Sequence, residues 1–462
     1  MRGSRAPLVW LALTTTVVSC AYYNGLFNAN RLAGDAERAE REGRSGEARS
    51  LWARAAVKAE SVATRYPDSR HRDDALLLWG RALYEGQNCR NAIDPLVLAV
   101  DSSPDPAIQS EARLYLGRCH VELRRPDSAI VVLEPLLADS GSAIAAEALL
   151  LKGRAELSRG QYDAAVADLR HVPNEEAAFD LAQAYLSLRQ LDDAMEVLDQ
   201  RVPGPYEESQ WLSMLDSVGA QELEPASSLV DQLIAKRELT TGERARLLLG
   251  DGRRWSDGRY PDRAAQRFSA ATSVVSPDSV EAGLARAYLA IAELRGTRDL
   301  ERLTDLKETL DESVRRGGNT IPVVAQASLL VNHAVTVLSN PEAPGADLRM
   351  FIVAEEFRDS LDATVPAVAL FLRLERDYPQ SVVAPKALLG AAALEPARRD
   401  AIRQMLQDRY PESPYTLVLA GVGSERFAVL EDSLRTLLAT ERILLLQRVT
   451  GERGADVERE RP

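Results

Sequence analysis

The chain has 462 residues, a formal net charge of −13, 27% charged residues and only 5% aromatic residues. Its length allows several globular domains or one extended repeat array, and its many Ala, Leu, Arg and Glu residues favour helices covered by small side chains. The acidic balance argues against a nucleic-acid partner, because proteins that bind phosphate backbones present basic surfaces.

Residues 1–19 are typical of a bacterial secretory signal. Arg2 and Arg5 form a charged start, and an apolar segment runs from Leu8 to Val18. Such a segment is too short to cross a bilayer as a mature helix. The sequence therefore predicts a signal peptide.

The signal ends in Val17-Val18-Ser19-Cys20. This tetrapeptide resembles the lipobox of bacterial lipoproteins, which implies that Cys20 is lipidated, with palmitate among its acyl chains. Each buried methylene of an acyl chain contributes about 0.8 kcal/mol to membrane binding. In that family an Asp after the Cys retains the protein at the inner membrane, so Ala21 favours lipid anchoring at the outer membrane, facing the periplasm. An ordinary signal with an incidental Cys, or a plain membrane anchor, are the alternatives.

Residues 20–30 form a tether that is rich in aromatic side chains for this chain, with Tyr22, Tyr23 and Phe27. Amphipathic rings suit contact with a partner or with the membrane interface. The alternative is a strap packed on the first repeat.

Residues 31–201 contain a repeated pattern of small residues. A small residue is followed twelve positions later by Ala, and four positions after that by a large apolar residue. The sets are Ala36, Ala48, Trp52; Gly80, Ala92, Leu96; Gly117, Ala129, Leu133; Gly153, Ala165, Leu169; and Ala182, Ala194, Leu198. The spacing predicts pairs of closely packed antiparallel helices. It resembles the tetratricopeptide repeat, which implies an all-α, right-handed α-solenoid of helical hairpins.

Polar and apolar residues recur at fixed distances from each small residue. One position later come Arg81, Arg118, Arg154 and Gln183; three earlier come Leu77, Leu114, Leu150 and Phe179; six earlier come Asp74, Glu111, Glu147 and Glu176. We call these the ladder positions. The resemblance implies that they line a peptide-binding groove. One hypothesis is that the arginines bind an acidic segment or a terminal carboxylate; the other is that they form ion pairs between adjacent repeats.

Cys89 and Cys119 are the two cysteines besides Cys20. In the repeat register both fall at the same edge of the stack, and an exported compartment permits a disulfide. A disulfide between them and two free thiols both remain open.

The pattern breaks at Val202-Pro203-Gly204-Pro205, so we predict a joint over residues 202–225. Middle helical repeats follow in residues 226–318, where Gly252, Ala264 and Phe268 restore the spacing. C-terminal repeats occupy residues 319–448, although Glu355 stands where a small residue belongs. Residues 449–462 are charged and are predicted to be a disordered tail.

A short motif that contains Tyr-Pro, here called the Tyr-Pro phrase, occurs three times in the chain. It reads Tyr66-Pro67-Asp68-Ser69, then Tyr378-Pro379-Gln380-Ser381 and Tyr410-Pro411-Glu412-Ser413. Proline stops a helix, and the Asp or Ser behind it caps the next one. The phrase resembles the repeats of outer-membrane lipoproteins such as the helical-repeat lipoprotein of the β-barrel assembly machinery and the periplasmic coordinator of cell division.

Enzyme signatures are absent from the sequence: it has no GxSxG, P-loop, HExxH or CxxC motif. Four dispersed histidines lack metal-ligand spacing. We therefore expect no enzyme activity, cofactor or metal, and instead a membrane-tethered scaffold or adaptor that binds envelope proteins or peptide segments, in outer-membrane protein assembly. The alternatives are a coordinator of peptidoglycan synthesis or cell division, and an enzyme or solute-binding lipoprotein with a deep pocket.

Overall fold

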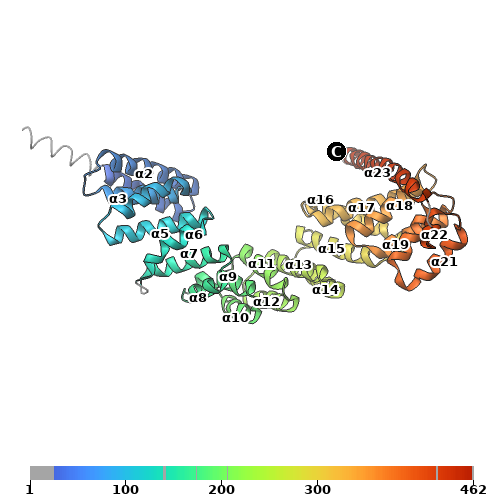
Figure 1. Cartoon of the computed structure of the whole chain (residues 1–462), viewed down its shortest axis with the longest axis horizontal. Coiled ribbons are helices and arrows are strands. Elements are labelled where there is room, and N and C mark those ends of the chain that lie inside the picture. The colour runs from blue at the N-terminus through green and yellow to red at the C-terminus, as the bar shows by residue number, and fades with distance from the viewer. Residues whose placement is uncertain (1–24, 139–141, 173, 205, 423–424, 460–462) are drawn as a thin grey trace, which may run out of the picture. The chain divides into compact units, whose positions relative to one another are not determined.

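The computed structural model describes residues 25–138, 142–172, 174–204, 206–422 and 425–459, and these residues form helices and short 3₁₀ turns without a strand (Figure 1). They divide into two compact units, Met1–Pro225 and Ala226–Pro462. The prediction of an all-α fold built from helical hairpins is confirmed. The predicted signal peptide, Cys20 and the tyrosines of the tether lie outside the described residues.

Unit 1 is a stack of helical hairpins. It begins with a helix over residues 25–41. The following helices are α2 (Ser45–Arg65), α3 (Arg72–Glu85), α4 (Cys89–Ser102), α5 (Pro106–Glu122), α6 (Pro126–Leu133), α7 (Ala143–Arg159), α8 (Tyr162–Leu169), α9 (Asn174–Ser187), α10 (Leu191–Arg201) and α11 (Glu208–Gly219). The boundary between the units falls within α12 (Leu223–Lys236). Each helix from α2 to α9 contacts the next one along the chain, and α11 contacts α9. The first helices of successive hairpins, α3, α5, α7 and α9, also contact one another. They therefore share one face of the unit.

The small residues stand where the two helices of a hairpin come closest. A Cβ added at Gly153 would lie 2.5 Å from Leu169 Cγ, which is a steric clash. Gly80 faces Leu96 and Gly117 faces Leu133 in the same way. These leucines are fully buried, so the small residue lets the large one fill the space between the helices.

The turn inside each hairpin has a residue with positive φ seven positions after the small residue. Glycine supplies it at Gly43 and Gly160, with φ of 74° and 79°. Other residues adopt the same conformation at Gln87, Arg124 and Arg189, with φ of 62°, 54° and 60°. The left-handed backbone is thus a fixed part of the repeat, and it costs a non-glycine residue about 1 kcal/mol.

Unit 2 contains longer and less regular hairpins. Its helices are α13 (Thr241–Asp257), α14 (Pro261–Val274), α15 (Val280–Gly296), α16 (Leu303–Arg315), α17 (Pro322–Ser339), α18 (Ala346–Leu361), α19 (Thr364–Asp377), α20 (Ala384–Leu394), α21 (Arg399–Arg409), α22 (Pro414–Leu419) and α23 (Glu425–Arg459). α13 and α14 repeat the close approach, because a Cβ at Gly252 would lie 2.5 Å from Phe268 Cε1.

The Tyr-Pro phrases join neighbouring hairpins of unit 2 as well as ending helices. Tyr378 Oη donates a hydrogen bond of 2.7 Å to the carbonyl of Pro341, which follows α17. Tyr410 Oη donates one of 2.9 Å to the carbonyl of Pro379. Each acceptor is the carbonyl of a proline that lies just after an earlier second helix, α17 for Tyr378 and α19 for Tyr410. These bonds help to fix the spacing between second helices.

Two predicted boundaries differ from the structure. The predicted joint over residues 202–225 contains α11 and the start of α12, because Pro203 and Gly204 end only α10 and Pro225 sits in the first turn of α12, where proline is tolerated. The predicted tail of residues 449–462 overlaps the last part of α23, which ends at Arg459.

α17 is long and apolar enough to cross a membrane, the one such helix among the described residues. Half of its apolar segment is buried within the unit. It contacts α16 on one side and α18 on the other. The apolar composition of α17 is therefore explained by its packing as a core helix of unit 2.

Glycine substitutions test the close approach. Gly117→Ala should lower the free energy of unfolding by about 1–3 kcal/mol, because the new methyl group overlaps Leu133. Gly34→Ala, in the helix over residues 25–41, is the matched control: its Cβ would meet nothing within 4 Å, so alanine should raise stability by up to about 1 kcal/mol. Denaturant unfolding of the purified protein measures both. Equal effects at the two positions would contradict the packing argument.

Candidate partner-binding face

The ladder positions lie on α3, α5, α7 and α9, the first helices of four hairpins of unit 1. We call the surface that they form the ladder face. The structure brings the predicted residues together there, but not as one continuous groove.

Each ladder arginine is paired with a carboxylate of a neighbouring first helix. Arg118 Nε donates to Glu147 Oε1 at 2.7 Å, and Arg154 Nε to Asp180 Oδ2 at 2.7 Å. Arg81 pairs with Glu37, in the helix over residues 25–41. The structure thus contains the ion pairs of the second hypothesis, with partners from the preceding hairpin for Arg81 and from the following one for the other two.

Arg118 is held more firmly than the other two arginines. Its guanidinium lies 4.7 Å from the ring centroid of Tyr115 and 5.6 Å from that of Tyr84, a cation–π arrangement. Burial disfavours its charge, but the bond to Glu147 outweighs that cost and the pKa of Arg118 is raised. Arg118 therefore stays charged. Together with the buried Leu114, it belongs to neither of the two cavities described next.

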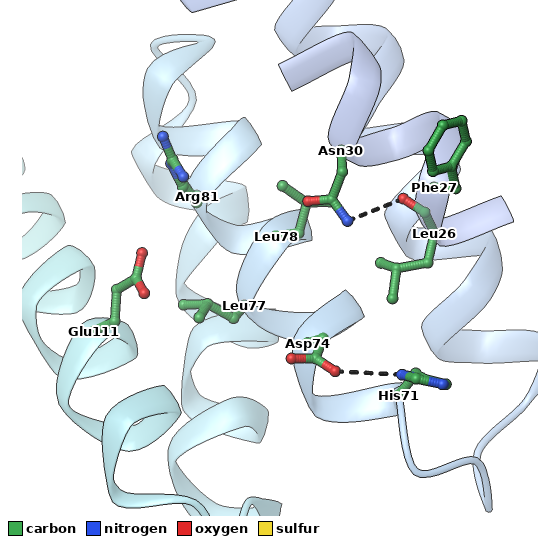
Figure 2. Close-up of a pocket in the computed structure, with 9 residues that line it drawn as sticks. All are labelled: Leu26, Phe27, Asn30, His71, Asp74, Leu77, Leu78, Arg81 and Glu111. Atoms are coloured by element: carbon green, nitrogen blue, oxygen red, sulfur yellow. Dashed lines mark hydrogen bonds and ion pairs between the residues drawn. The ribbon is translucent and has the colours of Figure 1, made fainter. Parts of the chain in front are cut away.

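The first cavity has a volume of about 430 Å³ and lies between the start of unit 1 and α3 (Figure 2). Its lining comes from three first helices: Leu26, Phe27, Asn30, His71, Asp74, Leu77, Leu78, Arg81 and Glu111. His71 Nδ1 lies 3.6 Å from Asp74 Oδ2. Phe27 is 54% exposed, although the helix that carries it packs through Ala29 and Leu32. The end of the predicted tether is therefore both a packed helix and part of the cavity wall.

The second cavity, of about 670 Å³, lies at α7, α9 and α11. Four predicted groove residues line it: Leu150, Arg154, Phe179 and Gln183. The other lining residues are Glu176, Asp180, Glu207, Ser209, Gln210, Ser213 and Met214. Phe179 packs edge-on against Trp211, with ring centroids 5.1 Å apart, which fixes the apolar side of the cavity.

The second cavity is acidic. Three acids line it: Asp180 is paired with Arg154, Glu207 lies 3.4 Å from the buried Arg201, and Glu176 is exposed. Its wall also offers three apolar side chains, of Leu150, Phe179 and Met214. This combination favours a ligand with cationic and apolar groups over an acidic one.

Sequence reasoning missed the contribution of α11. Glu207 and Met214 fall in the predicted joint, where prolines and glycines suggested irregular structure. The signal that was present is the spacing of Trp211, Met214, Leu215 and Val218, all of which are buried on one side of α11.

Cys89 and Cys119 are free thiols in the structure, and both are buried. Cys89 Sγ donates to Glu122 Oε2 at 2.8 Å. Burial raises the pKa of Cys119 to about 11, and the pKa of Cys89 is raised as well, by burial and then by Cys119 and Glu122.

Unit 2 has a cavity of its own, of about 540 Å³, lined by five arginines: Arg298, Arg373, Arg376, Arg398 and Arg409. Each has a carboxylate partner, such as Asp377 for Arg373 at 3.1 Å and Glu395 for Arg298 at 2.5 Å. Residues far apart in the sequence meet here, so no local pattern indicated it. Within the described part of the chain, no group of three or more His, Cys, Asp or Glu residues is arranged to hold a metal ion.

Charge reversal on the ladder face tests the ion pairs. Arg118→Glu should lower the free energy of unfolding by about 2 kcal/mol, because it removes the cation–π contact and faces Glu147 with a like charge. Adding Glu147→Arg should restore most of that loss. Arg154→Glu should cost less than about 1 kcal/mol, since the Arg154 side chain is 41% exposed. Thermal and denaturant unfolding measure all three; an Arg118→Glu variant of unchanged stability would contradict a structural role.

No protein-family model matches the sequence, and no curated protein matches it. Similar solved structures include a tetratricopeptide repeat protein from Parabacteroides merdae, with 14% identity over 57% of this chain and 99% of that chain and a TM-score of 0.37. Others are the C-terminal part of a repeat protein from Cytophaga hutchinsonii (13% identity, 68% and 98% coverage, TM-score 0.34) and the pilF protein of Pseudomonas aeruginosa (21%, 45% and 94%, 0.32). At these identities the likeness concerns the helical-repeat fold and assigns no function.

Proposed function

We propose that the protein is a lipid-anchored scaffold of the bacterial envelope, which binds a segment of a partner protein on the ladder face of unit 1 and serves outer-membrane protein assembly. The observation that carries the binding role is that ladder residues of successive hairpins line two cavities: Leu77 and Arg81 the first, and Arg154, Phe179 and Gln183 the second. The lipobox-like segment at Cys20 supports the anchor, and the Tyr-Pro phrases support the assembly role.

The partner segment is basic and apolar. An acidic segment would have to compete with Glu147 for Arg118 and with Asp180 for Arg154, both of which are in direct contact. A lysine or arginine would instead meet the exposed Glu176 beside Phe179 and Met214. This changes the ligand expected from the arginines alone, because their charge is already balanced within the chain.

The anchor would place the first cavity near the membrane. Five residue steps separate Cys20 from Gly25, where the described helix starts, so the two are at most about 18 Å apart. Leu26, Phe27 and Asn30 of that helix line the first cavity. A lipid on Cys20 would therefore hold this end of unit 1 close to the bilayer surface.

Removing the acylation site tests the anchor. Cys20→Ala should abolish incorporation of labelled palmitate and move the protein from the membrane to the soluble periplasmic fraction. Cys119→Ser is the matched control and should keep both label and location, since Cys119 is buried in unit 1. Palmitate labelling that persists in the Cys20→Ala protein would refute the anchor.

Peptides of opposite charge test the binding role. A peptide that combines lysines with leucine and phenylalanine should bind the purified protein at least about tenfold more tightly than the same peptide with glutamates. Glu176→Lys should remove most of this preference, whereas Glu196→Lys, an exposed acid on α10, should leave it unchanged. Fluorescence anisotropy measures the affinities.

The possible outcomes separate the hypotheses. Tighter binding of the acidic peptide, lost on Arg154→Glu, would restore the carboxylate hypothesis for the arginines. Binding of neither peptide would refute the groove. Co-purification from detergent-solubilised membranes then distinguishes the processes: β-barrel assembly proteins support the proposed role, and peptidoglycan synthases support coordination of wall synthesis instead.

A further inference from the structure

The hairpin of α18 and α19 keeps the register of unit 1, although Glu355 replaces its small residue. Asp362, seven positions later, has a φ of 53°, which matches the positive φ at this place in the hairpins of unit 1. The ladder positions of α18 are therefore Arg349, Ile352 and Glu356. Their charges are reversed relative to unit 1, where the acid comes first and the arginine last.

The charged ladder positions of α18, Arg349 and Glu356, form ion pairs with another helix of the same chain, α23. Arg349 Nη1 lies 3.0 Å from Glu441 Oε2 of α23, and Arg442 Nε lies 3.4 Å from Glu356 Oε1. The approach is close: a Cβ at Gly345, just before α18, would lie 2.8 Å from Glu441 Oε1. The reversed ladder pair of α18 thus matches an adjacent Glu-Arg pair on α23.

The contact continues along α23 in the direction of α20 and α22. Lys386 Nζ, on α20, lies 2.8 Å from Glu431 Oε2, and Tyr415 Oη, on α22, donates to the same carboxylate. Leu434, Leu438 and Leu445 are buried on this side of α23. α23 therefore folds back over earlier helices of unit 2, and it also contacts α17 (Figure 1).

The surface beneath α23 carries polar groups beside the positions that bury its leucines. His333 of α17 lies 3.3 Å from Glu356 and is almost fully buried, and the half-buried Glu355 neighbours Glu356. Charged groups of this kind are rehydrated when a covering helix leaves, whereas an apolar core is not. This surface therefore has the chemistry of a separable interface.

The outer side of α23 is apolar as well. Val429, Leu437, Ile443 and Leu444 are 68%, 40%, 58% and 40% exposed. A helix selected only to close the end of a repeat stack would carry polar residues on that side. α23 instead presents apolar side chains on two sides, so it has a surface for a further contact whether or not it is seated on unit 2.

We propose that the surface formed by α18, α20 and α22 is a helix-docking site, that α23 occupies it as an intramolecular ligand, and that a partner's amphipathic helix with leucines and an adjacent Glu-Arg pair takes its place. The observation that fixes this ligand chemistry is the match of Arg349 to Glu441 and of Glu356 to Arg442. This site is separate from the two cavities of unit 1 and does not depend on the function proposed for them.

A peptide of residues 426–445 is the probe. In the unmodified protein α23 competes at the high effective concentration of a tethered segment, so the labelled peptide should bind weakly. Glu441→Arg with Arg442→Glu weakens the seat of α23 while leaving the docking surface intact, and the same peptide should then bind at least about tenfold more tightly. The matched control reverses Asp432 and Arg435, an exposed pair on α23 with side chains 73% and 78% exposed, and should bind as weakly as the unmodified protein.

A second variant reverses the surface itself. In the protein with Arg349→Glu and Glu356→Arg, a peptide that carries E441R/R442E should bind more tightly than the unchanged peptide. This preference is opposite to that of the unmodified surface and does not depend on absolute stability. If the Glu441→Arg, Arg442→Glu protein binds the unchanged peptide no better than the control does, or if the reversed surface shows no reversed preference, the docking site is refuted.

Discussion

The structure depends on one steric constraint, the close approach of paired helices at a small residue. Gly117 and Gly153 leave room for Leu133 and Leu169, which fill the hairpin interior. Because this contact fixes how the two helices are rotated, every other position in the repeat follows from it. The left-handed turn residue comes seven positions later, and the ladder residues point to one face. Burial of a leucine contributes about 1.5–3 kcal/mol, so the constraint also stabilises each hairpin directly.

The hairpin of α18 and α19 shows what happens when the small residue is absent. Glu355 occupies its position, and burial raises the pKa of this carboxyl, although Arg358, Lys386 and Arg442 oppose the shift. Phe371, the large residue of this hairpin, instead lies against Gly390 of α20, where an added Cβ would meet its ring at 3.2 Å. The close approach has moved to the next helix. The turn at Asp362 keeps the register, so the ladder residues of α18 still face one side and receive α23.

The sequence spacing predicted the features of the fold that depend on contacts within one hairpin. The small residues, their large apolar partners and the ladder positions could be predicted because those of one hairpin lie within about two dozen residues of sequence. Which carboxylate meets which arginine was not readable: Arg154 pairs with Asp180 and not with Glu176, because the choice depends on the rotation between hairpins. α11 was hidden by Pro203 and Gly204, whose turn signals say where a helix ends but not how soon the next begins. The contact of α23 with α18 joins Arg349 to Glu441, which are 92 positions apart in the sequence. A periodic sequence pattern cannot predict a contact over that separation.

The two units use the same positions in opposite ways. In unit 1 the ladder arginines are neutralised by carboxylates of adjacent first helices, so the pairs help to fix the spacing of the stack and leave the selection of a ligand to the exposed acid Glu176 beside Phe179. In unit 2 the order of charges on α18 is reversed, and the pair is satisfied by a helix from outside the hairpin. The Arg349–Glu441 pair is largely buried, with side chains 4% and 16% exposed. An occupant without the matching charge would leave Arg349 buried and unpaired, so the pair discriminates between occupants. The order of charges at the ladder positions thus accompanies a difference in what contacts them: carboxylates of adjacent first helices in unit 1, and α23 in unit 2.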